Sequence, residues 1–243
     1  MITGATERLR PFVTLHAAGA RTTLHRHSAP YVAFVLEGGY EERSIDGLWR
    51  CEAGDLVIHP PMHLHVNDFT GRRSRVLNFI LPSKTPAHAA HSYGVWRPRD
   101  PDAVRRLNGL AADEIAEVLA GAVPAMPIAP GSALSGMAER LASDPRCRIG
   151  DRQNHPATTR EHASRAFRRH FGFPPAVFRS EQRFRAALQL LADFTRSLVS
   201  VALDAGYADQ AHLTRDFRAR TGASPSAFRR ALRLERRITS VQS

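Results

Sequence analysis

Two patterns of hydrophobic and polar residues divide the chain. From about Thr14 to Leu81, short runs rich in β-branched and aromatic residues alternate with turn signals such as Asp46-Gly47. The runs include YVAFVLEGGY, AGDLVIHPP and SRVLNFILP. Short strands without helices between them predict a β-sandwich or a small barrel. The stretch before them, Arg8 to Ala20, fits either a first strand or a flexible arm.

Beyond these strands the periodicity becomes helical. Pro101 to Val123 carries apolar residues at helical spacing among arginines and glutamates, which predicts an amphipathic helix. The next stretch, VPAMPIAPGS, is dense in Pro and Gly and predicts the start of a linker. A further helix is expected from about Ser132 to Ser143, where Asp144-Pro145 ends it.

The C-terminal part contains an internal repeat. Residues 160–179, REHASRAFRRHFGFPPAVFR, align without a gap with residues 210–229, QAHLTRDFRARTGASPSAFR. Such a repeat indicates two copies of one supersecondary unit. The identical pairs are His162 and His212, Arg165 and Arg215, Phe167 and Phe217, Arg168 and Arg218, Gly172 and Gly222, Pro175 and Pro225, Phe178 and Phe228, and Arg179 and Arg229.

Each copy predicts a helix that buries one face and carries arginines on the other. In the second copy Leu213 and Phe217 are four residues apart, and Gly222 and Pro225 mark the helix end and the next helix start. A shorter apolar pattern precedes this copy, and Gly206 follows it as a turn residue. A helix, a turn with glycine and an arginine-bearing helix form the helix-turn-helix plan. The preceding pattern consists of Leu198, Val201, Ala202 and Ala205.

Charge separates the same two parts of the 243-residue chain. Residues 1–144 hold 15 Lys and Arg against 15 Asp and Glu, whereas residues 145–243 hold 19 Arg against 8 acids. The whole net charge of +11 therefore lies in the part with the repeat. A neutral part followed by a basic part with helix-turn-helix patterns indicates binding to a polyanion, most simply DNA.

The stretch SLVSVALDAGYADQAHLTRDFRARTGASPSAFRR is similar to the signature of the AraC/XylS family of bacterial transcription regulators. The likeness covers the second helix-turn-helix in full and the first from Thr159 onward. It implies a cytoplasmic, sequence-specific regulator that binds double-stranded DNA and a small-molecule effector, forms a homodimer and contacts RNA polymerase. The implied domains are a cupin-like sensor over residues 1–100, a helix and linker over 101–131, and a double helix-turn-helix domain over 132–243. The helix either packs two sensor domains together as a dimer, which we favour, or covers the barrel of its own chain.

The family pattern places two recognition helices, from about Thr159 to His170 and from about Asp209 to Arg220. Side chains near the start of each would face bases, and later arginines would contact the DNA backbone or remain surface charge. Arg220 is expected among the latter. The DNA-contacting residues implied in this way are Arg160, Glu161, Ser164, Arg165, Arg168 and Arg169 in the first helix, and Gln210, Ala211, Thr214, Arg215 and Arg218 in the second.

The first unit departs from the family in the helix before its recognition helix. The chain has IGDRQNHPATT where an amphipathic helix is expected, and Pro156 would break a helix interior. We therefore expect weaker and less specific DNA contact from the first unit than from the second.

The N-terminal part resembles the two cupin motifs. Gly19, His25, His27 and Gly38 follow the first motif, and Gly54, Pro60, His65 and Asn67 roughly follow the second. Tyr31 stands where cupins place a metal-binding glutamate, and Met62 replaces a glycine. His25, His27 and His65 supply three nitrogen ligands for a transition metal, with His63 as a spare candidate. The alternative, which we favour, is that these histidines line a pocket without holding a metal, so that no cofactor is required.

A barrel of this size has room for one small ligand. The residues expected to face it are His25, His27, Tyr31, Phe34, Trp49, His65 and Phe79, with Leu36 and Val57 as further inward positions. We therefore expect a cupin-like β-barrel or jelly roll followed by an all-α domain with two helix-turn-helix units.

Two further features narrow the function. Cys51 and Cys147 make no disulfide framework, and neither a signal peptide nor a membrane-length apolar run is visible. The alternative to a regulator is a metal-dependent cupin enzyme that uses His25, His27 and His65 and carries a DNA-binding tail. No general base is evident beside these histidines, so we expect no enzyme.

Overall fold

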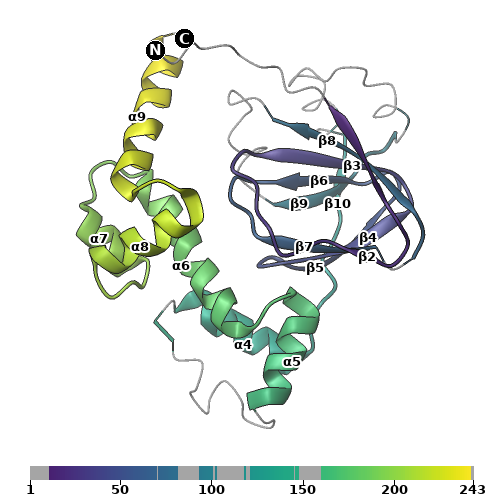
Figure 1. Ribbon diagram of the computed structural model, residues 1–243, viewed down its shortest axis with the longest axis horizontal. Helices are drawn as coiled ribbons and strands as arrows, with labels where there is room; N and C mark the ends of the chain where they lie inside the picture. The colour runs from purple at the N-terminus through teal and green to yellow at the C-terminus, as the bar shows by residue number, and fades with distance from the viewer. Residues whose placement is uncertain are drawn as a thin grey trace. The chain divides into compact units, whose positions relative to one another are not determined.

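The computed structural model divides the chain into two compact units, residues 1–129 and 130–243. It describes residues 11–69, 71–81, 93–100, 102, 118, 121–144, 146–147 and 160–241. Sheets form the first unit and helices the second (Figure 1). In the part of the chain that is described, no helix is both long and apolar enough to cross a membrane.

The sheet unit contains two antiparallel sheets, seen as two layers in Figure 1. One sheet has six strands in the order β1-β8-β3-β6-β9-β10, and the other has four in the order β2-β7-β4-β5. The strands are β1 (Phe12–His16), β2 (Ala20–Arg21), β3 (Tyr31–Glu37), β4 (Gly39–Ser44), β5 (Gly47–Glu52), β6 (Leu56–His59), β7 (His65–Phe69), β8 (Ser74–Ile80), β9 (Gly94–Arg97) and β10 (Val123–Pro124).

The core of this unit lies between the two sheets. Side chains of β3, β6, β8 and β9 from one sheet and of β4, β5 and β7 from the other form a single buried cluster. Because successive side chains of a strand point to opposite faces, Tyr31 and Val57 share this interior with Trp49. The inward positions predicted for these three side chains are confirmed.

The inward positions predicted for Phe34, Leu36 and Phe79 are wrong. Phe34 and Phe79 belong to a second buried cluster with Val32 and Ile58, against which Leu36 packs. Val32 and Phe34 alternate with Tyr31 and Ala33 along β3, so the second cluster lies on the opposite face of the six-stranded sheet. Both faces of this sheet are covered, so β3 is an almost continuous apolar run whose two faces the sequence does not distinguish.

Two uncertain segments of the sequence belong to the sheets. Residues 12–16 form a strand that pairs with β8, which settles the choice between strand and arm for the described residues. The sequence predicts a linker that begins at Val123, but the first residues of this stretch belong to the sheet unit. Val123 and Pro124 pair with β9, and Ile128 forms a bridge with Leu48. Of the helix expected over residues 101–123, most lies outside the described residues, although Val118 packs against the second cluster.

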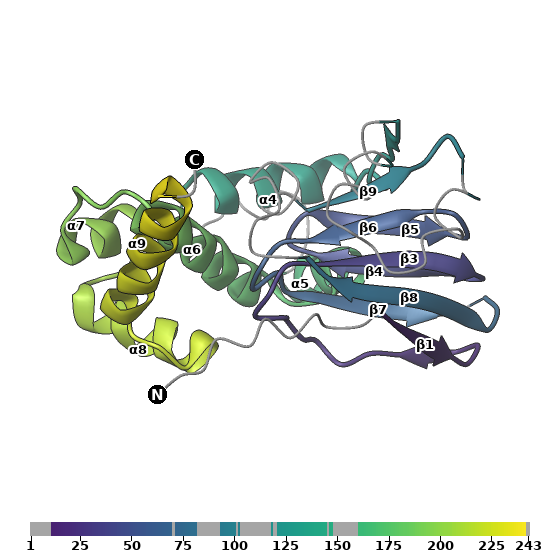
Figure 2. The same cartoon turned by 90° about the horizontal axis from the view of Figure 1, so that it is seen from above.

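The helical unit contains the helices that the periodicity predicts (Figure 2). The helices expected over residues 132–143, 159–170 and 209–220 differ from the observed ones by at most one residue at each end, because capping residues and glycines fix helix ends locally. The helices are α4 (Ser132–Ser143), α5 (Arg160–Phe171), α6 (Pro175–Leu191), α7 (Leu198–Asp204), α8 (Gln210–Thr221) and α9 (Pro225–Val241).

The α7–α8 pair is fixed by its caps and its turn. The Ser197 side chain accepts from the Ser200 N–H at the start of α7, and the Asp209 side chain accepts from the His212 N–H at the start of α8. Gly206 has φ 84° in the turn, and Gly222 has φ 74° where α8 ends. Residues with side chains rarely adopt such angles, so both glycines are required by the backbone.

Equivalent aromatic residues form the core under each copy of the repeat. Phe167 and Phe217 are fully buried. The ring of Phe167 lies 5.1 Å from that of Phe178, and the ring of Phe217 lies 5.3 Å from that of Phe228 (centroid distances). The predicted core role of these residues is confirmed, although Phe228 is only partly buried.

Arg220 was expected on the surface or at the DNA backbone, and this expectation is wrong. Its guanidinium pairs with Glu181 of α6 and with Asp216 of α8, the latter at 2.9 Å. It also lies 5.0 Å from the centre of the Phe184 ring. Only 13% of the Arg220 side chain and 5% of the Glu181 side chain are exposed. Arg220 therefore ties α8 to α6.

Among the described residues, Met62 is the one non-glycine residue with a left-handed backbone, at φ 64°. Its N–H donates to the His27 carbonyl at 2.7 Å. The family pattern places a glycine here, and a side chain in this region costs about 1–2 kcal/mol. The hydrogen bond and the flanking strands therefore hold a strained turn between β6 and β7.

We expect Arg220→Met to lower the free energy of unfolding of the helical unit by about 3–5 kcal/mol, because Glu181 stays buried without its cation. Arg218→Met, two residues away on the exposed face of α8, is the matched control and should change it by less than about 0.5 kcal/mol. Urea denaturation followed by circular dichroism measures both. Equal effects of the two substitutions would contradict the structural role of Arg220.

We expect Met62→Gly to be more stable than Met62→Ala by about 1 kcal/mol, because both variants lose the same side-chain contacts but only glycine relieves the left-handed strain. Thermal denaturation of the sheet unit within the full chain compares the two. An alanine variant as stable as the glycine variant would show that the turn is unstrained.

Candidate functional site

The outer face of α8 presents most of the residues predicted to contact DNA. Because Leu213 and Phe217 are buried beneath the helix, residues offset from them by about a quarter turn or more point to solvent. Gln210, Ala211, Arg215 and Arg218 are exposed. Thr214 is half-buried, and its hydroxyl donates to the Gln210 carbonyl at 2.8 Å. Thr214 is thus less available to a base than its neighbours.

The corresponding face of α5 has the same character. Glu161, Arg165, Arg168 and Arg169 are exposed, and Ser164 is half-buried. The helix begins at Arg160, whose side chain lies outside the described residues, as do Thr159 and the unusual stretch that contains Pro156. Both repeat copies therefore expose arginines at equivalent positions on a helix that a buried phenylalanine holds in place.

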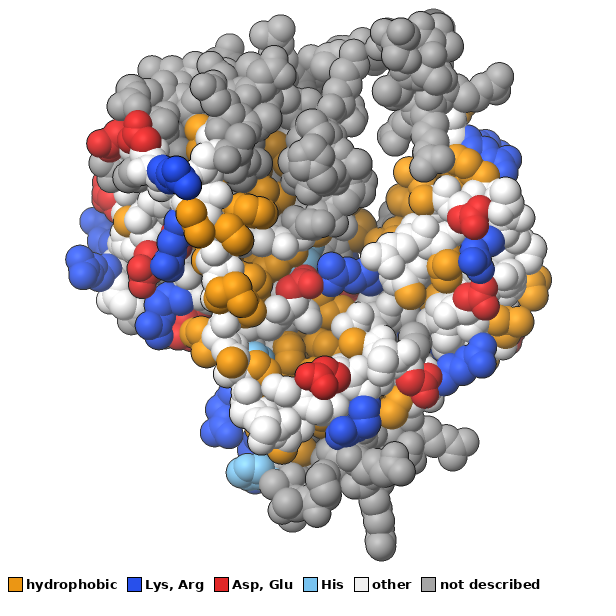
Figure 3. Space-filling view, turned by 180° about the vertical axis from the view of Figure 1, so that it is seen from behind, with side chains coloured by type: hydrophobic (Ala, Val, Ile, Leu, Met, Phe, Trp, Pro, Cys, Tyr) orange, Lys and Arg blue, Asp and Glu red, His pale blue; other side chains and the backbone are white. Residues whose placement is uncertain are grey.

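The charge of the surface is mixed where Figure 3 shows it. On that face, blue cationic and red acidic side chains are interspersed over both units, without a large patch of one sign.

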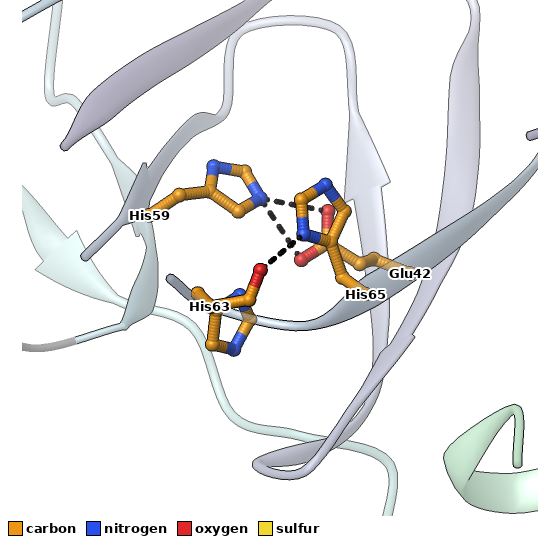
Figure 4. A group of neighbouring side chains, drawn as sticks. All are labelled: Glu42, His59, His63 and His65. Atoms are coloured by element: carbon orange, nitrogen blue, oxygen red, sulfur yellow. Dashed lines mark hydrogen bonds and ion pairs between the residues drawn. The ribbon is translucent and has the colours of Figure 1, made fainter. Parts of the chain in front are cut away.

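A second candidate site lies in the interior of the sheet unit, where four polar side chains are buried together (Figure 4). Glu42 comes from β4, His59 from the end of β6, His63 from the turn that follows, and His65 from the start of β7. Their exposed fractions are 0%, 1%, 6% and 0%. Each offers one oxygen or nitrogen atom, and these four atoms lie within 4.8 Å of one another.

Hydrogen bonds connect this cluster internally. The Nε2 atom of His59 lies 3.0 Å from both carboxylate oxygens of Glu42, as Figure 4 shows. With its amide oriented to satisfy both of its groups, Asn67 also donates to Glu42 Oε2 at 3.1 Å. A buried carboxylate requires partners of this kind, because removing it from water is costly.

The other two histidines are oriented by groups around the cluster. His63 Nε2 lies 3.0 Å from Asp46 Oδ2. His65 Nδ1 lies 3.2 Å from the His63 carbonyl, so this nitrogen carries the proton and donates it. The remaining nitrogen of His65, Nε2, therefore accepts from the Tyr31 hydroxyl at 3.1 Å. The ring positions and the tautomer of His65 are thus set before any ligand binds.

Burial favours the neutral form of His59 and His65. It lowers the pKa of His59 and the pKa of His65 well below the usual value, and for His59 the neighbouring histidines lower it further. Burial also raises the pKa of Tyr31, with a contribution from Glu42, so its hydroxyl stays protonated. Neutral imidazole nitrogens with lone pairs are ligands for transition metals, whereas protonated ones are not.

The structure also brings together the three histidines predicted from the cupin motif. One nitrogen from each of His25, His27 and His65 lies within 4.8 Å of the others. His65 is buried, but His25 is only partly buried and His27 is exposed. The ring of Tyr31, at the position of the missing glutamate, packs 4.3 Å from that of His27 (centroid distance). The two groups of histidines share His65.

The sequence prediction missed Glu42 and His59. A signal for each exists, because each lies two residues from an inward apolar residue, Tyr40 for Glu42 and Val57 for His59. Period-two alternation therefore points both side chains inward. Trp49 and Tyr31 do lie in the same interior, where Tyr31 stacks on His59 with ring centroids 4.2 Å apart.

Comparison with known proteins identifies a domain in the C-terminal unit. A model described as "Helix-turn-helix domain" matches residues 155–231. The chain is 29% identical over 182 residues to the HTH-type transcriptional regulator RipA of Corynebacterium glutamicum, covering 72% of this chain and 54% of RipA. It is 37% identical over 59 residues to the virulence regulon transcriptional activator VirF of Yersinia enterocolitica, covering 24% and 22%.

A solved structure of ToxT from Vibrio cholerae aligns with 92% of this chain and 98% of its own at 9% identity, with a TM-score of 0.42. The chain spans about half the length of RipA and about a fifth of VirF. The domain model spans the second copy of the repeat, residues 210–229. The C-terminal unit therefore matches a helix-turn-helix domain, and the chain is similar to proteins named as transcription regulators.

Proposed function

We propose that this protein is a sequence-specific DNA-binding transcription regulator. Its helical unit would act as two helix-turn-helix units, and its sheet unit as a cupin-like jelly roll that senses a small effector. The observation that carries the proposal is the repeated arrangement on α5 and α8, in which Phe167 and Phe217 are buried while Arg165 and Arg215 are exposed at equivalent positions. Relatives named as transcription regulators support the same function.

The chemistry of α8 suits base recognition in the major groove. Arg215 can pair bidentately with guanine and Gln210 with adenine, each contributing about 1–3 kcal/mol of discrimination. Arg218 lies one turn further along the helix, where a contact with phosphate would position the protein without reading sequence. On α5, Glu161, Arg165, Arg168 and Arg169 would take the corresponding roles, with Arg160 and Ser164.

α6 sets the spacing of the two recognition helices. Its 17 residues give a length of about 25 Å. Successive major-groove faces on one side of the duplex are about 34 Å apart. A helix of this length, with α5 before it and the α7–α8 pair after it, is compatible with two recognition helices in successive grooves. The first unit is proposed to contact DNA less specifically, because Pro156 interrupts its supporting segment.

The sheet unit is proposed to bind the effector through polar groups at its interior. The candidates that remain are His25, His27, Tyr31, Trp49 and His65, because Phe34 and Phe79 face the opposite side of the sheet. Effector binding changes DNA binding only if the effector has different affinities for two arrangements of the protein. A homodimer and a contact with RNA polymerase complete the proposal, by analogy with the family.

The metal-dependent enzyme is the weaker alternative. It relies on His25, His27 and His65, which the structure does bring together. However, the relatives that cover the C-terminal domain are named as transcription regulators. A regulator accounts for both the doubled motif and the basic half, whereas an enzyme accounts for neither.

We expect Arg215→Ala to lower affinity for a DNA fragment from upstream of the gene by about 5- to 150-fold and to leave affinity for random DNA within about twofold, because it removes base recognition worth about 1–3 kcal/mol. Arg72→Ala removes an equal, exposed charge from the sheet unit and should change neither affinity. Fluorescence anisotropy measures both. If the wild type shows no salt-sensitive preference for its own upstream DNA, the proposed function fails.

We expect Arg218→Ala to weaken binding to all DNA sequences alike and to reduce the slope of log affinity against log salt by about 1, because one phosphate contact is lost. A salt series with specific and random fragments measures the slopes. A loss confined to the specific fragment would place Arg218 at a base instead of a phosphate.

A further inference from the structure

We propose that Glu42, His59, His63 and His65 together bind one divalent transition-metal ion, for which Zn²⁺ is the representative. This site is separate in its ligand set from the His25–His27–His65 group, and it adds a metal to the function proposed above. The proposal stands independently of DNA binding, because it concerns four residues inside the sheet unit.

The first support is the convergence of suitable atoms. Three imidazoles and one carboxylate form an N3O set of the kind that Zn²⁺ and neighbouring divalent metals prefer. Their ligand atoms already lie within 4.8 Å of one another. Bonds of about 2.0–2.2 Å in a tetrahedral site place ligand atoms about 3.3–3.5 Å apart. The four side chains therefore need to close by only about an ångström around an ion.

The second support is the arrangement around the ligands. Histidines that bind metal almost always donate their other N–H to a carboxylate or a carbonyl. His63 Nε2 lies 3.0 Å from the Asp46 carboxylate, and His65 Nδ1 donates to the His63 carbonyl at 3.2 Å. The opposite nitrogens, His63 Nδ1 and His65 Nε2, are thereby directed to carry lone pairs. The supporting contacts of a metal site are already present.

The third support is a buried imidazole nitrogen that has no hydrogen-bond partner in the described part of the chain. The Nδ1 atom of His63 is buried and has no hydrogen-bond partner among the described residues. It is the nitrogen opposite the one that contacts Asp46, and it gains a partner when a metal binds. For His59 the ligand atom is Nε2, which without a metal donates its proton to Glu42. When a metal binds Nε2, the neutral ring carries its proton on Nδ1 instead.

Electrostatics favour a cation at this point. Glu42 is fully buried, and His59 Nε2 lies 3.0 Å from its carboxylate. A carboxylate in a low-dielectric interior is costly, and a divalent ion beside it offsets that cost. The site thus offers one carboxylate and three imidazoles, the usual composition of a histidine–carboxylate metal centre.

The other histidine group is the less suitable site. It contains no carboxylate, and His27 is exposed. Because the two groups share His65, a single ion occupies one group or the other. The matched substitutions His59→Gln and His27→Gln therefore distinguish the two sites.

The test uses the full chain, stripped of metal with a chelator and titrated with Zn²⁺ alone in an isothermal calorimeter. We expect one equivalent to bind, with Glu42→Gln and His59→Gln lowering the affinity by more than about 100-fold and Asp46→Asn by about 10- to 100-fold. His27→Gln should bind like the wild type. Circular dichroism establishes that each variant is folded.

Three results would overturn the proposal. They are the absence of stoichiometric binding by the wild type, undiminished binding by a folded His59→Gln, and a loss in His27→Gln as large as that in His59→Gln. If the buried variants fail to fold, anomalous scattering from crystals of zinc-loaded wild type decides the question. An ion between Glu42 and His59 supports the proposal, and an ion at His27 overturns it. Neither readout depends on whether the helical unit binds DNA.

Discussion

The burial of an element's apolar face orients the functional side chains of α8 and β4. In α8 the burial of Leu213 and Phe217 directs Arg215 to solvent, because a helix places residues on one face at a spacing of three to four. In β4 the burial of Tyr40 directs Glu42 inward, because a strand has a period of two. The same hydrophobic effect therefore exposes the arginines of one unit and encloses the polar cluster of the other.

The helical unit was largely predictable from the sequence, because its signals are local. Asp209 caps α8 and Gly222 ends it, so the expected helix from Asp209 to Arg220 differs from the observed Gln210–Thr221 by one residue at each end. The role of Arg220 was not predictable in the same way. Its partner Glu181 lies 39 residues earlier on α6, and nothing in the local pattern reveals that contact.

The sheet unit was predictable as strands but only partly as a site. β3 is apolar on both faces, so the pattern could not show that Phe34 points away from Tyr31. Glu42 and His59 were not predicted for a different reason, because the cupin motif spacing includes His25, His27 and His65 but neither of these two residues. Strand pairing places Glu42 opposite Asn67, and Tyr31 opposite His59, and such register becomes visible only in the fold.

The two units suit a division between sensing and DNA binding. His63 and His65 are oriented by hydrogen bonds to the Asp46 carboxylate and the His63 carbonyl, so a metal ion would meet ligand atoms already in place. His65 belongs to both histidine groups and contacts Tyr31. A ligand bound to one group would therefore change the position or hydrogen bonding of a residue in the other. Ligand binding in the sheet unit changes DNA binding by the helical unit only if the ligand has a higher affinity for one arrangement of the protein than for another.

Under the proposed function, both arginine-bearing helices of the repeat enter the major groove of one DNA site. Methylation interference on a fragment from upstream of the gene tests it most directly, because methylated guanine N7 atoms report protein in that groove. The account predicts two clusters of interfering guanines on one face of the duplex, separated by about one helical turn of 10–10.5 base pairs. A single cluster would show that only one of the two helices contacts bases. Uniform or absent interference would contradict the claim that this basic unit reads DNA sequence.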